Sequence, residues 1–208
     1  ICGIHKYVEA PDFEILLFAY AFDDDPVTVV DLAQGEKIPK EVMQALKSDV
    51  IKTAWNAAFE RTAIAKHFGI KCDPHFWRCS MVHAYTLGLP GSLEKAAIAL
   101  GLEENKDTKG KNLIRYFSVP CKPTLANGGR TRNLPEHAPD KWQEFIEYNR
   151  QDVVVEREIR KRLERFPVPE REWKLWAIDQ RINDTGIRID MDLVEKAIRF
   201  SEQHTEQL

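Results

Sequence analysis

The chain has 208 residues, of which 43% are hydrophobic and 30% are charged, and its 30 Lys and Arg against 33 Asp and Glu give a formal net charge of −3. This composition excludes an intrinsically disordered chain, and the near-neutral total excludes a uniformly basic nucleic-acid-binding surface. The longest apolar run, residues 15–22, is far shorter than the ~20 residues that a membrane-spanning helix needs, so we expect no membrane partner.

The first part of the chain predicts strands and helices in alternation. Residues 14–22 are apolar on both alternate faces, which is typical of a central strand covered on two sides, and the β-branched run 27–32 predicts a second strand after a turn. A helix is predicted to start at Pro39. Residues 50–55 predict a third strand that leads directly into a helix over 57–68.

Helices dominate the remainder. Residues 79–88 and 92–101 each predict a helix ended by glycine, and a long helix is predicted over 140–165. The Pro-x-Pro segment at 167–169 is the best domain boundary, and beyond it we expect a helix, a short strand over 187–190 and a last helix. The predicted fold is therefore α/β: a mixed sheet flanked by helices, with a C-terminal helical extension.

The ends and the cysteines suggest the context of the chain. It begins at Ile1 without a Met and stops inside a helical pattern, so we expect a piece of a longer protein. Its four cysteines, without a secretory leader, favour a reducing cytoplasm over a disulfide framework.

Two of these cysteines leave a zinc site open as an alternative. Cys72, His75, Cys79 and His83 recur at short intervals, as metal ligands can. The surrounding segment, however, has the pattern of a strand end followed by an apolar helix. We therefore favour core packing, in which a cysteine behaves as a small hydrophobic residue.

The long helix carries an acid on its apolar face. Five residues recur at steps of three and four and so share this face: Phe145, Tyr148, Asp152, Val155 and Ile159. A buried carboxylate needs a partner, because burying the charge alone is costly. An ion pair with an arginine at position 150, 157 or 160 is one alternative, and a bound metal cation is the other.

The junction between the third strand and its helix offers a second acid. Asn56 is a natural N-cap, and Glu60 in the first turn is favoured there by the helix dipole, which is an ordinary structural explanation. Its position past the carboxyl end of a strand is also where α/β domains bind ligands.

A basic segment follows the small helices. Seven cationic residues against Asp107 give it a local charge of 7 − 1 = +6: Lys106, Lys109, Lys111, Arg115, Lys122, Arg130 and Arg132. Lys122, Arg130 and Arg132 lie in its loop-forming half and are the candidate contacts to a DNA backbone. A solvated connecting loop is the alternative.

Two of these motifs resemble a known family. The spacings Asn56-Ala-Ala-Phe-Glu60 and Tyr148-Asn-Arg-Gln-Asp152 are similar to the second and third motifs of the tyrosine-containing DEDD 3′–5′ exonucleases. With SLEKAAIALGL between them and INDTGIRIDMDLVEKAI after the proline pair, the whole chain resembles phage-type family A DNA polymerases. The resemblance implies a ribonuclease-H-like exonuclease domain over residues 1–166, followed by the start of the polymerase region at 167–208.

The resemblance also implies the chemistry. Family members hold two Mg²⁺ or Mn²⁺ ions between acidic side chains and hydrolyse the 3′-terminal phosphodiester of DNA. Asp152 and Glu60 would be metal ligands, although Glu60 stands where the family usually has Asp. Tyr148 would orient the attacking water, and Asn56 would help to position the primer end. The expected partners are a single-stranded or frayed primer 3′ end and the polymerase domain of the same parent chain, in a bacterial or phage-infected cell.

At the first motif of the family, the chain departs from the family's pattern. The family has an Asp-x-Glu on its first, central strand, whereas the triplet Asp12-Phe13-Glu14 precedes its strand here and follows a proline. By resemblance the strand over 14–22 is the family's second, so we expect the first strand to be missing and the isolated fragment to be weakly active or inactive.

The sequence therefore leaves three functions open. The leading one is the proofreading exonuclease of a DNA polymerase. A free-standing RNA exonuclease is opposed by the polymerase-like C-terminal segment. The third is a catalytically degenerate domain that serves the polymerase as a DNA-binding scaffold.

Overall fold

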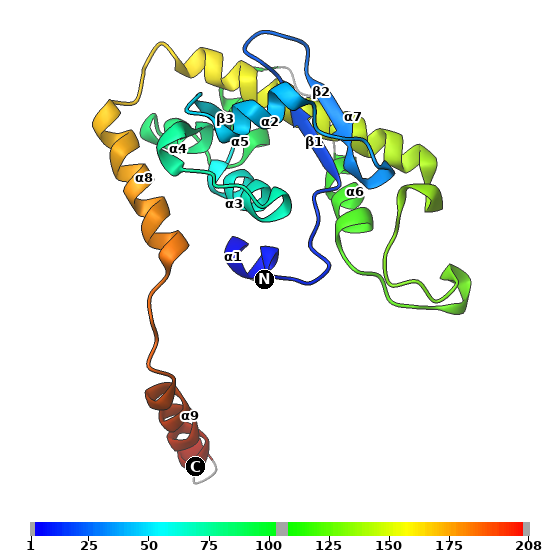
Figure 1. The fold of residues 1–208 in the computed structure, drawn as a ribbon, viewed down its shortest axis with the longest axis vertical. Helices are drawn as coiled ribbons and strands as arrows, with labels where there is room; N and C mark the ends of the chain where they lie inside the picture. Colours follow the sequence, from blue (N-terminus) through cyan, green and yellow to red (C-terminus); the bar gives the residue numbers. More distant parts are fainter. Residues whose placement is uncertain (1–2, 103–107, 206–208) are drawn as a thin grey trace.

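The computed structural model describes residues 3–102 and 108–205, and helices form most of it (Figure 1). The helices are α1 Ile4–Val8, α2 Lys40–Lys47, α3 Ala57–Phe68, α4 Ser80–Thr86, α5 Leu93–Ala99, α6 Thr108–Ser118, α7 Pro139–Leu163, α8 Glu170–Thr185 and α9 Met191–Thr205. The strands are β1 Leu17–Tyr20, β2 Thr28–Asp31, β3 Lys52–Ala54 and β4 Trp77–Cys79. Short 3₁₀ turns are η1 Leu32–Gln34, η2 Pro74–Phe76, η3 Leu125–Asn127 and η4 Pro135–His137.

The strands form two separate pairs within the described residues. β1 and β2 are antiparallel, with Leu17 opposite Asp31, and β3 and β4 are parallel, with Lys52 opposite Trp77. The expectation of a central strand at β1 is thus wrong in one respect: among the described residues, β1 is hydrogen-bonded to β2 alone. Each pair consequently has two outer edges that no described strand covers.

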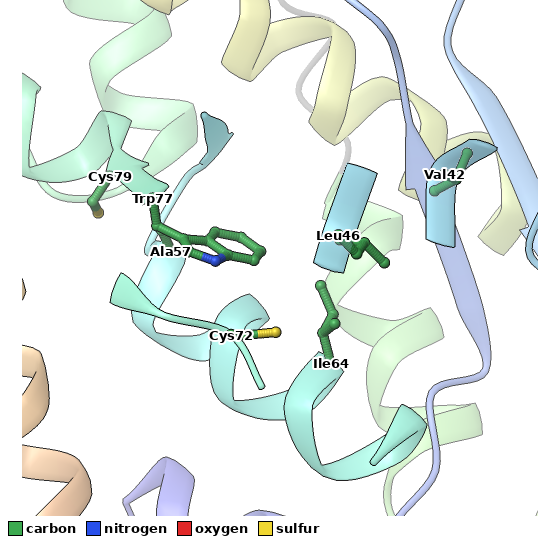
Figure 2. Packing of buried hydrophobic residues seen from close by; sticks show 7 residues of the cluster. All are labelled: Val42, Leu46, Ala57, Ile64, Cys72, Trp77 and Cys79. Atoms are coloured by element: carbon green, nitrogen blue, oxygen red, sulfur yellow. The ribbon is translucent and has the colours of Figure 1, made fainter. Parts of the chain in front are cut away.

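The two faces of β1 are nevertheless both covered, as its sequence predicts. Phe18 and Tyr20 pack on a core formed by α2, α3 and β4, whereas Leu17 packs on a second cluster formed by α6 and α7. Figure 2 shows the first core, in which Trp77, Cys72 and Ile64 lie together. β1 is therefore sandwiched between helices, which explains why its residues are apolar at every position.

The C-terminal helices differ in their packing. α8 returns to the domain: Trp176 packs on the first core, and the guanidinium of Arg78 lies over the ring of Trp173 at 5.3 Å. α9 follows an extended segment and lies away from the rest of the chain (Figure 1). The strand predicted over 187–190 is wrong, because this segment is exposed and has no described strand beside it to pair with.

Candidate active site

The junction between β3 and α3 places the first two candidate residues. Asn56 lies just before α3 with left-handed backbone angles (φ 60°, ψ 46°), and its side chain does not cap the helix. The N-cap expectation is therefore wrong at the side-chain level. Capping needs an extended backbone at this residue, whereas asparagine tolerates the left-handed turn that joins strand to helix here. Its exposed side chain remains free to face a ligand.

Glu60, one turn into α3, has an unusual environment. The residue is partly exposed, but its Oε2 atom is enclosed and has no hydrogen-bond partner within the described structure. The pKa of Glu60 is raised from 4.5 to about 8: burial is the largest cause, a backbone hydrogen bond opposes it, and the charges of Glu156 and Asp152 add to the rise. At neutral pH the site thus favours either a proton or a cation on this carboxyl group.

The long helix α7 presents the second acid as its periodicity predicts. Phe145, Val155 and Ile159 are buried, and Tyr148 and Asp152 are partly buried between them on the same face. The apolar stripe with a central carboxylate is confirmed. Its aspartate faces the same region as Glu60, because the Asp152 charge contributes to the Glu60 pKa.

The arginines that were alternative partners of Asp152 have acceptors of their own. Arg150 binds the carboxylate of Glu147 at 3.1 Å as well as the Val27 carbonyl. Arg157 donates to backbone carbonyls before β2, and Arg160 donates to Glu164 at 2.7 Å. These bonds tie the exposed side of α7 to the β1–β2 turn and to its own last turn.

Glu156 is a residue that the sequence reasoning missed. It is buried one turn after Asp152, and the hydroxyl of Ser80 at the start of α4 donates a hydrogen bond to its carboxylate. Burial raises the pKa of Glu156, while the Ser80 hydrogen bond and two arginines lower it. The signal was present as an acid four residues after Asp152. We call Glu60, Asp152 and Glu156 the acidic cluster.

Lys109, Lys111 and Arg115 of the basic segment lie in α6. The candidate DNA contacts at positions 122, 130 and 132 lie in a loop before α7 that we call the basic loop (residues 119–134; Figure 1). Arg130 donates to the Asn133 side chain at 3.0 Å and to the Asn127 carbonyl at 3.2 Å. Arg132 forms an ion pair with Glu14. Lys122 is exposed. Both arginines are thus engaged within the chain, and the structure does not bring them to the acidic cluster.

Two other expectations can be placed. Lys106 and Asp107 of the basic segment lie outside the described residues. In the zinc alternative, Cys72 and Cys79 are buried in the first core, and His83 is hydrogen-bonded to the Phe166 carbonyl. The residues that the structure describes contain no group of three or more His, Cys, Asp or Glu arranged to hold a metal.

The donor set at Glu60 and Asp152 fits part of a metal site. Carboxylate oxygens suit Mg²⁺ and Mn²⁺, and the enclosed Oε2 atom of Glu60 is an acceptor still lacking a partner in the described chain. A cavity of about 420 Å³ between α3 and α8 lies apart from these residues. Its polar walls include Arg61 and Asp184, which bind each other, so it offers no better candidate.

Comparison with known protein families shows the superfamily to which the chain belongs. A model of the RNase H superfamily matches residues 8–164, and the chain belongs to this superfamily. The predicted ribonuclease-H-like α/β fold with a helical C-terminal extension is thereby confirmed.

The chain is also similar in sequence to an individual phage protein. Over 203 residues, or 97% of its length, the chain is 63% identical to a DNA polymerase of Bacillus phage SP02. The chain spans 31% of that relative's length. No solved structure matches significantly. The resemblance to the exonuclease region of phage DNA polymerases, first seen in two motifs, is confirmed. In the described residues no helix is long and apolar enough to cross a bilayer.

Proposed function

We propose that this chain is the 3′–5′ proofreading exonuclease region of a phage-type DNA polymerase, acting on a single-stranded or frayed primer 3′ end. The observation that carries the proposal is the pair of acids Glu60 and Asp152. Glu60 has an enclosed carboxylate oxygen without a hydrogen-bond partner in the described chain, and Asp152 lies one turn of α7 after Tyr148. Identity to a phage DNA polymerase and membership of a superfamily that generally uses divalent metals support it.

The residues divide the chemistry between them. Glu60 and Asp152 would hold Mg²⁺ or Mn²⁺, which in a pair would supply an activated water and stabilise the charge that develops on the phosphate. The Tyr148 hydroxyl would orient the attacking water by hydrogen bonding, a role that requires no ionisation. Asn56, exposed at the start of α3, would position the terminal nucleotide.

We further propose that the centre of the sheet is supplied by a strand outside this sequence. Support comes from the two separate strand pairs and from the incomplete carboxylate set around Glu60. Such a strand, carrying Asp-x-Glu, would contribute the remaining metal ligands. Asp12 and Glu14 do not replace it, because they precede β1 and Glu14 is held by Arg132.

An extension experiment tests this reading. The 208-residue chain and a version extended upstream to include an Asp-x-Glu strand would each be incubated with Mn²⁺ and a 5′-labelled single-stranded oligonucleotide. We expect progressive shortening from the 3′ end with the extended protein and little or none with the chain alone. Rapid degradation by the chain alone would contradict the missing-strand proposal, and inactivity of both would contradict the exonuclease proposal.

A second function has one observation in its favour. The described residues contain no complete metal-binding group, as expected of a degenerate exonuclease domain that survives as a DNA-binding scaffold for the polymerase. The coding sequence just upstream of Ile1 discriminates the two: an apolar strand with Asp-x-Glu selects the enzyme, and its absence selects the scaffold.

The remaining assignments follow from the same proposal. Residues 1–166 would form the exonuclease domain, and residues 167–208 would begin the polymerase region of the same parent chain. The protein would act in the cytoplasm of a bacterial or phage-infected cell.

A further inference from the structure

Gly110 in α6 is in unusually close contact with the proposed catalytic tyrosine. A Cβ atom added to Gly110 would lie within 3.0 Å of three ring carbons of Tyr148, namely Cδ2, Cε2 and Cζ. Real Cβ atoms essentially never come so close to other heavy atoms. The Tyr148 ring therefore occupies the space that any other residue at position 110 would fill.

The backbone itself does not require glycine at this position. Gly110 is not among the residues with positive φ, and it lies inside a helix, where glycine costs about 1 kcal/mol relative to alanine. Several other glycines of the chain, such as Gly69 and Gly128, have a positive φ and open space where a Cβ would be. At Gly110 the reason for glycine is space for the tyrosine.

The Tyr148 ring also packs against hydrophobic residues of both α6 and α7. Tyr148 packs against a buried cluster that includes Leu113 and Phe117 of α6, with Trp142 and Phe145 of α7. The rings of Phe117 and Phe145 are stacked at 5.5 Å between centroids, and the Trp142 ring lies edge-on to Phe117. Such a rigid aromatic cluster leaves the tyrosine little room to yield toward the core.

We infer that Gly110 is a positioning residue, which lets the Tyr148 ring lie against the backbone of α6 and so fixes where its hydroxyl group points. This inference rests on the proposed exonuclease function for its catalytic consequence, but not for the contact itself. A methyl group at position 110 would push the ring aside, and displacing a catalytic group by about 1 Å can cost about 100-fold in rate.

The contact is tested first by stability, in the 208-residue chain. We expect Gly110→Ala to lower the melting temperature when Tyr148 is present. In a Tyr148→Ala background, the same substitution should raise it, because the space is open and alanine favours the helix. A Gly110→Ala effect of the same sign and size in both backgrounds would overturn the inference. If Gly110→Ala alone does not fold, recovery of folding in the double variant supports it equally.

The catalytic consequence is tested by single-nucleotide excision in the parent polymerase that we propose. We expect Gly110→Ala to lower kcat about 10- to 100-fold while KM for a single-stranded oligonucleotide changes less than about twofold. Added to Tyr148→Phe, it should cause no further loss. An unchanged kcat for Gly110→Ala, where Tyr148→Phe is defective, would overturn the positioning role. An unchanged kcat for Tyr148→Phe would contradict the proposed role of the tyrosine, whereas the stability result would still report on the contact.

Gly91 supplies a matched control. A Cβ on Gly91 would likewise lie within 3.0 Å of three tyrosine side-chain atoms, here the hydroxyl oxygen, Cζ and Cε1 of Tyr85, an exposed tyrosine on α4 that has no place in the proposed site. We expect Gly91→Ala to leave kcat for excision unchanged, since it crowds a tyrosine of no catalytic role. A loss of kcat as large as that of Gly110→Ala would show a general packing defect and overturn the inference.

Discussion

The acidic cluster and the basic loop treat their charges in opposite ways. In the acidic cluster, Glu60 keeps an enclosed oxygen without a hydrogen-bond partner in the described chain, and the charges of Glu156 and Asp152 act on its carboxyl group. In the basic loop, Arg130 and Arg132 already have acceptors within the chain. A buried polar group without a partner indicates a ligand site, whereas a charged group that is paired within the chain indicates a structural role. The acids are therefore the stronger functional candidates.

The largest effect should come from the acid at the centre of α7. In the parent polymerase, Asp152→Asn should reduce 3′ excision by about 1,000-fold, or ~4 kcal/mol of transition-state stabilisation, if the aspartate holds a metal. Release of the 3′ nucleotide from a labelled oligonucleotide with Mn²⁺ measures it. Asp140→Asn, at the exposed start of the same helix, is the control and should keep full activity. Equal activity in both variants would remove Asp152 from the site.

The second prediction concerns the raised pKa of Glu60. The folded chain holds this proton up to about pH 8, whereas an unfolded glutamate releases it near 4.5. The proton therefore stabilises the metal-free fold fully below pH 4.5, and this contribution is lost as the pH rises toward 8. We expect the melting temperature to fall over this range in EDTA and Glu60→Gln to remove most of the fall.

Two comparisons make the pH experiment specific. Glu94→Gln changes an exposed glutamate in the first turn of α5 and should leave the pH profile as it is. Added Mn²⁺ should raise the melting temperature more at pH 8 than at pH 5, because the cation replaces the proton. A flat profile in the unsubstituted chain would show that Glu60 is not protonated at neutral pH.

The third prediction uses Arg61, which follows Glu60 in the sequence and whose charge is paired with a carboxylate of the same chain. Its buried guanidinium donates to both carboxylate oxygens of Asp184 in α8, at 2.8 and 2.7 Å. Asp184→Asn should destabilise the chain by about 2 kcal/mol, less than a fully buried pair because Asp184 is 35% exposed. Urea unfolding measures the loss, and Asp192→Asn in exposed α9 should cause none.

The smallest effects should come from the basic loop. Arg130→Glu with Arg132→Glu should weaken oligonucleotide binding by about tenfold at low salt and reduce its salt dependence, if the loop contacts phosphates. Glu14→Gln should instead strengthen binding about two- to threefold, since it releases Arg132 from its ion pair. Fluorescence anisotropy at several salt concentrations measures both. Binding that is insensitive to all of these changes would leave the loop a purely structural connection.

Local patterns predicted much of this molecule because the deciding interactions are local. The stripe on α7 and the doubly apolar β1 follow from side-chain periodicity, which is set by backbone geometry alone. The same reasoning failed at residues 187–190, where a strand-like sequence has no partner strand, and at Asn56, where the turn geometry overrides its capping preference.

The rest of the site depends on contacts between distant segments. Nothing in the sequence around Gly110 connects it with Tyr148, which follows 38 positions later and meets it only when α6 packs on α7. The Ser80–Glu156 hydrogen bond and the Arg132–Glu14 pair join segments still farther apart in the sequence, by 76 and 118 positions. Contacts of this kind form only in the tertiary structure, and local sequence patterns do not predict them.

The docking of α8 has a practical consequence for making a shorter protein. A cut at the proline pair near residue 167 would follow the predicted domain boundary, but it would deprive the Arg61 guanidinium of the carboxylate that it binds. A cut in the exposed stretch after Gly186 would keep the ion pair between Arg61 and Asp184. It would remove the amphipathic helix α9, whose hydrophobic residues, such as Leu193 and Phe200, are exposed to solvent. The second truncation is the one to express for crystallisation.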